Sequence, residues 1–240
     1  MKQVLIGSIC FVLLLLTGCF LPENQRMENR VAYPDQLESV QFAIKQFKED
    51  TGMLPIRTFD ENTSLYSRYI IEFNQLIPRY LQQPPGTAFE NGGVFQYVLV
   101  NVEDEPEVKV IDLTAQKVIQ QYQQRVNDYI RQNTYAPIEE IVDDGLFKLD
   151  YEELGYKEDP HVQSPYSDTF LPLLFTADRE VIIDYSIDLN LMLLEHDHAF
   201  KEGEDIRSIL YNHSAFVPSR SVPYVLDENG EPAFAMNLRN

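Results

Sequence analysis

Residues 35–52 read DQLESVQFAIKQFKEDTG, and this segment has the pattern of an amphipathic helix. Four apolar residues recur there at spacings of three and four: Leu37, Val40, Ile44 and Phe47. This spacing places an apolar stripe on one face of a helix. We expect a cap at Asp35 and an end at Gly52, because glycine readily takes the conformation that ends helices.

The surface that covers this stripe is expected in residues 94–113, which read VFQYVLVNVEDEPEVKVIDL. Val94–Val102 and Val108–Leu113 are rich in the β-branched and aromatic residues that are typical of strands. Glu103–Pro106 forms an acidic turn between them. We therefore predict an α+β fold in which amphipathic helices pack on antiparallel sheets.

A similar order of elements follows residue 113. Val118, Tyr122, Val126 and Tyr129 form a second helical stripe, which ends near Pro137. Further predicted elements are strands at Phe170–Phe175, Val181–Ile187 and Leu189–Leu194, a helix at Asp205–Tyr211, and a hairpin of Tyr224–Leu226 with Ala233–Ala235.

Spacing between matching residues suggests a duplication. Ile44 and Phe47 match Val126 and Tyr129 at a spacing of 82, and Ile111–Leu113 matches Ile187–Leu189 at a spacing of 76. A spacing that drifts while the order holds is what loop deletions produce. The hypothesis is two tandem units, and the alternative is two unrelated α+β units that align by chance.

The segments follow from these boundaries. We expect a signal at 1–18, a tether at 19–34, a first α+β unit at 35–113, a second unit at 114–189, and C-terminal strands with a hairpin at 190–240 that complete the body.

The N-terminus predicts export. A basic start at Met1-Lys2 precedes an apolar run from Val4 to Leu16, which is the pattern of a secretory signal and too short for a stable membrane span. The run ends in Leu16-Thr17-Gly18-Cys19. This resembles the lipobox of bacterial lipoproteins, in which the cysteine carries a diacylglyceryl thioether and becomes the first residue after cleavage.

That resemblance implies a location for the protein and a modification of Cys19. Cys19 would be lipidated, and the body would be anchored by its acyl chains on the extracytoplasmic face of the cell membrane. Cys10 would leave with the signal, so no free thiol would remain. The alternative is an ordinary signal peptide in which Cys19 is incidental.

Charge and composition limit the classes of partner that the chain is expected to bind. The chain has 38 acidic and 19 basic side chains and a formal charge of −19, which argues against nucleic acid. An acidic body should also stand away from an anionic membrane surface. At 44% hydrophobic the chain can bury a substantial core.

The first unit also has a more specific likeness. Phe47 is followed by Gly52, Pro55, Pro84-Pro85 and Gly93–Tyr97, an order that resembles the globular part of type II pseudopilins. The resemblance covers about 80 residues and implies a helix packed on an antiparallel sheet. Pseudopilins keep their apolar stretch as an assembly helix, whereas here cleavage would remove it. The likeness therefore implies a fold and not pilus assembly.

The second unit departs further, because Thr134 stands where that pattern has glycine. Taken whole, the chain resembles a family of uncharacterised lipoproteins of Bacillus-type bacteria. That resemblance brings no catalytic residues to this sequence.

The best metal candidate is Glu195-His196-Asp197-His198. On a strand, His196 and His198 would share one face, and His213 or His161 would be a third ligand. The alternative is a charged strand end at the surface. The acidic runs, such as Glu103–Glu105, lack the spacing of a calcium loop and are expected to be solvated turns.

We expect no cofactor and no enzymatic activity, because the sequence contains no recognised nucleophile motif. The favoured function is a lipid-anchored, non-enzymatic module that binds or scaffolds an envelope protein. The rival is an extracytoplasmic metal-binding protein or hydrolase that uses His196 and His198. A solute receptor is a third possibility, although the body is short for two large lobes.

Overall fold

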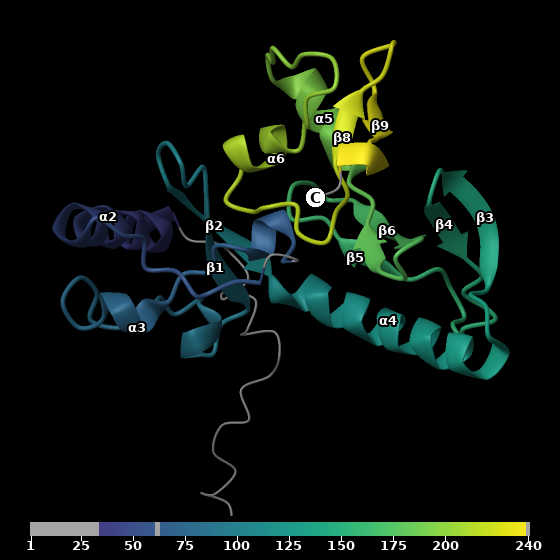
Figure 1. Cartoon of the computed structure of the whole chain (residues 1–240), viewed down its shortest axis with the longest axis horizontal. Coiled ribbons are helices and arrows are strands. Elements are labelled where there is room, and N and C mark those ends of the chain that lie inside the picture. Colours follow the sequence, from purple (N-terminus) through teal and green to yellow (C-terminus); the bar gives the residue numbers. More distant parts are fainter. Residues whose placement is uncertain (1–33, 61–62, 239–240) are drawn as a thin grey trace, which may run out of the picture. The chain divides into compact units, whose positions relative to one another are not determined.

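The structure is a computed structural model that describes residues 34–60 and 63–238 (Figure 1). It contains both helices and antiparallel sheets, which confirms the predicted α+β class. Cys19, the predicted signal and the tether up to residue 33 lie outside the described residues. Within the described part, no helix has the length and apolar character needed to cross a bilayer.

Helix α2, Pro34–Thr51, matches the helix predicted from the opening stretch. Its buried residues are Val40, Ala43, Ile44 and Phe47. Gly52 ends the helix with a φ of 70°, and its N–H donates to the Lys48 carbonyl over 2.9 Å. Asp35 lies in the first turn instead of capping it, because the helix begins one residue earlier.

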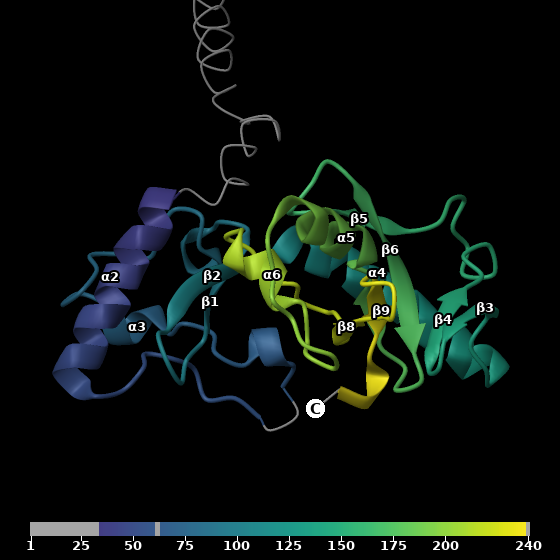
Figure 2. The same cartoon turned by 90° about the horizontal axis from the view of Figure 1, so that it is seen from above.

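The predicted hairpin is also confirmed. Strands β1, Phe95–Val100, and β2, Glu107–Asp112, pair antiparallel with Phe95 opposite Asp112 and Val100 opposite Glu107. Figure 2 shows α2 and α3, Phe73–Leu76, beside this hairpin. The cluster that α2 and α3 form with the hairpin contains Val40, Ala43, Ile44, Phe47, Phe73, Leu76, Phe95, Tyr97, Leu99, Val108 and Val110.

A second cluster covers the opposite face of the hairpin. It contains Tyr66, Val98, Val100, Ile111 and Val217. The apolar side chains of the hairpin are divided between two clusters because successive side chains of a strand point to opposite faces. The hairpin is therefore buried on both faces, which accounts for the near-continuous apolar run of β1.

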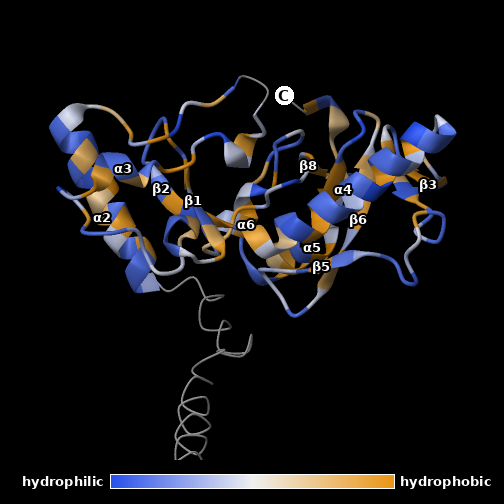
Figure 3. Cartoon of the chain, turned by 90° about the horizontal axis from the view of Figure 1, so that it is seen from below, coloured by the Kyte–Doolittle hydropathy of each residue, from blue (hydrophilic) through white to orange (hydrophobic). Residues whose placement is uncertain are grey.

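Helix α4, Leu113–Asn133, starts where β2 ends. Its buried residues are Ile119, Tyr122 and Val126, whereas Val118 is 37% exposed. The predicted stripe was therefore wrong at Val118, which lies one position from the buried Ile119 and so points to the flank. Figure 3 shows that hydrophilic and hydrophobic residues alternate along α2 and α4.

Helix α4 packs against β5 and β7 of a five-stranded antiparallel sheet. The strands are β3 Ile138–Asp143, β4 Leu146–Leu149, β5 His161–Gln163, β6 Phe170–Thr176 and β7 Val181–Ile183. Their order is β3-β4-β6-β5, and β7 also pairs with β6. Strands β3, β4 and β5 were not predicted from the sequence; β3 is acidic and exposed throughout, and β5 has only three residues.

The predicted strand at Leu189–Leu194 was wrong. Those residues belong to helix α5, Ser186–Glu195, and the strand expected at Val181–Ile187 stops at Ile183. The Asp184 carboxylate accepts the Ser186 N–H over 2.8 Å, a local bond that favours the turn into the helix. Leucine and methionine are also better helix formers than β-branched residues.

The C-terminal elements agree better with prediction. Helix α6, Ser208–Asn212, is shorter than expected, and β8, Tyr224–Leu226, pairs antiparallel with β9, Pro232–Phe234. The described residues also include the short helical turns η2 Leu65–Ser67, η3 Phe89–Asn91 and η4 Met236–Leu238.

The tandem-unit hypothesis loses one of its matched pairs. Ile111–Leu113 spans the end of β2 and the start of α4, whereas Ile187–Leu189 lies inside α5. The sheets differ as well, because one has two strands and the other five. Duplication stays a prediction that rests on the shared order of a long helix followed by strands.

Candidate functional site

An open groove of about 1160 Å³ lies beside strand β2. We call it the α2–β2 groove. It is lined by α2 residues between Pro34 and Glu49, by residues between Asn101 and Lys109, and by Asn212–Ala215. Most small-molecule pockets are smaller, so this groove has room for a segment of polypeptide.

Gln41 of α2 is one of the residues that line this groove. Its Nε2 donates to the Pro106 carbonyl over 2.8 Å, and its Oε1 accepts the Val108 N–H over 2.7 Å. Gln41 is half-buried, one helical turn from Leu37 and from the buried Ile44. A side-chain amide therefore satisfies two backbone groups on the edge of β2.

Further along the same edge of β2, the backbone groups of Val110 form hydrogen bonds with the backbone of another segment. The Val110 N–H donates to the Ala215 carbonyl over 2.9 Å, and the Val217 N–H donates to the Val110 carbonyl over 3.1 Å. Phe216 thus lies opposite Val110 as a parallel bridge. Residues 215–217 act as a very short third strand beside β2.

Residues 212–215 form one wall of the groove, and the side chain of Lys109 links this wall to strand β2. This side chain is 8% exposed, and its Nζ donates to the Ser214 carbonyl over 3.0 Å. The same Nζ lies 2.8 Å from a carboxylate oxygen of Glu107. Because the ammonium group is nearly buried, these contacts hold the wall more firmly than a surface ion pair would.

The groove is acidic overall. Five carboxylates line it, from Glu38, Glu49, Asp104, Glu105 and Glu107, against the three lysines Lys45, Lys48 and Lys109. Lys109 already serves Glu107 and Ser214. The surface is therefore better suited to a basic ligand than to an acidic one.

The structure gives the predicted histidine cluster a different geometry. His196 caps the C-terminus of α5 and does not lie on a strand. Its ring stacks on His213 with centroids 3.6 Å apart and an interplanar angle of 5°. Parallel stacked rings direct their nitrogens side by side and not toward one point, so this contact is not the geometry of two ligands on one metal.

The other histidines have aromatic neighbours of their own. His198 lies 5.5 Å from the Phe200 ring, and His161 lies 4.7 Å from the Phe170 ring. Over residues 34–60 and 63–238, no group of three or more His, Cys, Asp or Glu side chains is placed to hold a metal ion. The predicted third ligand His213 does reach His196, but as a stacking partner.

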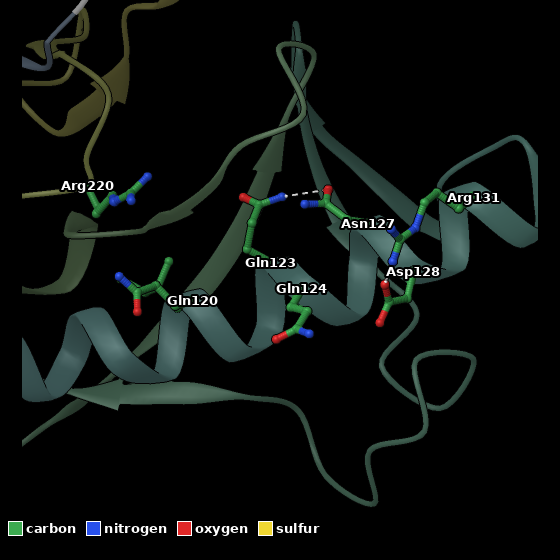
Figure 4. Close-up of a pocket in the computed structure, with 8 residues that line it drawn as sticks. Gln120, Gln123, Gln124, Asn127, Asp128, Arg131 and Arg220 are labelled. Carbon is green, nitrogen blue, oxygen red and sulfur yellow. Dashed lines mark hydrogen bonds and ion pairs between the residues drawn. The ribbon is translucent and has the colours of Figure 1, made fainter.

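A second hollow, of about 420 Å³, lies along α4 and is rich in amides (Figure 4). Gln123 is engaged there, because its Oε1 accepts the Val181 N–H over 2.7 Å and its Nε2 donates to Asn127 and to the Arg179 carbonyl. Asp128 and Arg131 form an ion pair at one end. These contacts tie α4 to the turn before β7, so the hollow serves the fold.

A third polar cluster is enclosed in the core. The carboxylate of Asp188, fully buried in α5, accepts hydrogen bonds from the Ser164 and Ser167 hydroxyls at 2.7 to 2.9 Å. Burial raises the pKa of Asp188, and the two hydroxyl donors oppose that shift. This cluster holds α5 against the loop after β5.

Arg207 makes a comparable structural contact. The side chain is almost buried, pairs with Asp205 over 2.6 Å and lies 5.1 Å from the Tyr66 ring centre. Burial raises the pKa of Tyr66, with Arg207 opposing the shift. This contact joins the 205–221 region to the second face of the hairpin.

The role of Gln41 was not predicted from the sequence. A glutamine beside a helical stripe reads as a solvated position, and no local pattern marks it as a partner of β2. Its role depends on residues more than sixty positions away. Only the proline and the acidic turn before β2 signalled that the strand begins near residue 107.

The fold and the groove define an α+β protein with a candidate binding surface at the edge of a two-stranded hairpin. Residues 33–112 match the model of the YphF family N-terminal domain. This range nearly coincides with the predicted first unit at 35–113 and contains Gln41, Pro106 and Val108. No curated protein and no solved structure matches the chain.

Proposed function

We propose that the chain is a lipid-anchored extracytoplasmic lipoprotein whose body is a non-enzymatic binding or scaffold module of the cell envelope. The α2–β2 groove is the surface that holds its protein partner. Cys19 supplies the anchor, through the lipobox-like Leu16–Cys19 at the end of the signal. The proposed location of the protein is the outer face of the cell membrane.

One observation carries the binding role. The groove lies beside a strand edge where two backbone groups are met by the amide of Gln41 and not by another strand. Strand edges with hydrogen-bonding groups near an open groove are a recurrent way for proteins to hold an extended peptide. The acidic body favours a soluble position above an anionic membrane surface.

Site-specific crosslinking in living cells tests this role. A photoreactive amino acid replaces Lys45, an exposed residue of the groove, and in a matched control it replaces Gln124, an exposed residue of α4 outside the groove. We expect position 45 to capture an envelope protein that position 124 does not. Equal capture from both positions, or none from position 45, would contradict the proposed site.

A further inference from the structure

The hydrogen bonds on the outer edge of β2 have the spacing of a parallel strand. Val110 bonds to Ala215 on one side and to Val217 on the other. In parallel pairing, every second residue of the partner turns both its N–H and its C=O toward the edge. Continuing backwards from 217 and 215, the next residue in this series is 213.

If that strand continued, residue 213 would donate to the Pro106 carbonyl and accept the Val108 N–H. The structure shows Gln41 Nε2 and Oε1 in those two roles, at 2.8 and 2.7 Å. His213 has turned away, because it ends helix α6 and stacks on His196. One position of a third strand is therefore filled by the side chain of a neighbouring helix.

We propose that an extended segment of the partner protein pairs in parallel with β2 beside Glu107 and displaces the Gln41 amide. This inference rests on the proposed function and names how the groove recognises its partner. A side-chain amide carries the same kinds of donor and acceptor as a backbone, and displacing it costs the two hydrogen bonds that it makes. Pro106 and Val108 would exchange one pair of hydrogen bonds for another.

The charges of the groove define the segment further. Because a parallel segment runs in the direction of β2, the residues before its pairing position lie toward Asp104 and Glu105. Carboxylates also outnumber lysines along the groove, as described above. The segment is therefore expected to carry basic side chains on its N-terminal side.

Two synthetic peptides probe this site on the full-length, lipidated protein in a neutral detergent. One alternates lysine with valine over ten residues, and the other has glutamate in place of every lysine. We expect the lysine peptide to bind and the glutamate peptide not to bind. In Gln41→Ala the lysine peptide should bind about tenfold more tightly, because no hydrogen-bonded amide must be displaced.

Gln124→Ala is the matched control, since it removes an exposed amide of α4 and should leave the affinity unchanged. Amide hydrogen exchange gives a second readout. In Gln41→Ala the Val108 N–H loses its acceptor and should exchange faster, and the lysine peptide should restore its protection. If Gln41→Ala does not fold, Gln41→Met supplies a side chain of similar length without the amide.

Equal affinity for the wild type and the Gln41 variant, or no protection of Val108 by the peptide, would overturn strand pairing. If crosslinking from position 45 still captured an envelope protein, the proposed function would stand while this mode of recognition fell. If that capture also failed, both would fall. Binding of both peptides alike would show nonspecific adsorption and would count against the proposal.

Discussion

Asp188 shows how a single carboxyl group is accommodated inside this core. Its side chain is fully buried, and the Ser164 hydroxyl lies within 2.9 Å of both carboxylate oxygens. Ser167 adds a third contact at 2.7 Å. Burial nevertheless raises the pKa above its ordinary value of 3.8, so hydration is only partly replaced by these hydrogen bonds.

This balance predicts the effect of Asp188→Asn on stability. At pH 7 the variant should lose about 1 to 3 kcal/mol of unfolding free energy, because its amide nitrogen cannot accept a serine hydroxyl. The raised pKa means that the folded state binds the proton more tightly than the unfolded chain. The wild-type carboxyl therefore gains stability as pH falls toward 3.8 and loses it as pH rises through the folded pKa.

The deficit of Asp188→Asn relative to wild type should consequently be larger at pH 4 than at pH 7. Urea unfolding of both proteins at the two pH values measures it. Asp104→Asn, which alters an exposed carboxylate of the β1–β2 turn, is the control and should change stability little at pH 7. A smaller stability deficit of Asp188→Asn at pH 4 than at pH 7 would contradict a raised pKa of Asp188 in the folded state.

Among the helices and strands, those whose formation depends on interactions within a short stretch of sequence were predicted correctly. The stripe of α2 and the hairpin of β1 and β2 were correct, since amphipathic spacing and turn residues are visible within short windows. The strand predicted at Leu189–Leu194 was wrong because an apolar run without clear spacing fits either a strand or a helix. The helix formed there depends on tertiary packing, including the buried contacts of Asp188.

The junction between β2 and α4 offers a test at this scale. Asp112 ends the strand opposite Phe95 and caps the helix, where its Oδ1 accepts the N–H and the hydroxyl of Thr114, each over 2.7 Å. Asp112→Ala should lower the free energy of unfolding by about 1 kcal/mol, because α4 loses its cap. Asp112→Ser keeps a capping oxygen and should lose less, and urea unfolding followed by circular dichroism compares the two. Equal losses would mean that capping does not carry the effect.

At the scale of the whole molecule, the candidate site joins segments that are far apart in the chain. Gln41, Val108 and Ala215 converge on one edge, yet each lies in a stretch that looks ordinary by itself. The fold class and the hairpin could therefore be predicted from the sequence, but the groove could not. His196 and His198 were predicted as metal ligands because two close histidines suggest a metal more readily than they suggest ring stacking.

The proposed anchor would decide where the whole body of the protein works. Cys19→Ala should abolish incorporation of labelled palmitate and leave the precursor uncleaved, because a thioether requires the cysteine sulfur. Cys10→Ala is a matched control within the signal, and it should be labelled and processed like the wild type. Two acyl chains hold a protein durably while one chain is marginal, so the wild-type protein should stay with membranes through salt washes. Palmitate label on Cys19→Ala, or an intact mass showing an unmodified Cys19 in the wild type, would remove the anchor and with it the proposed position of the groove outside the cell.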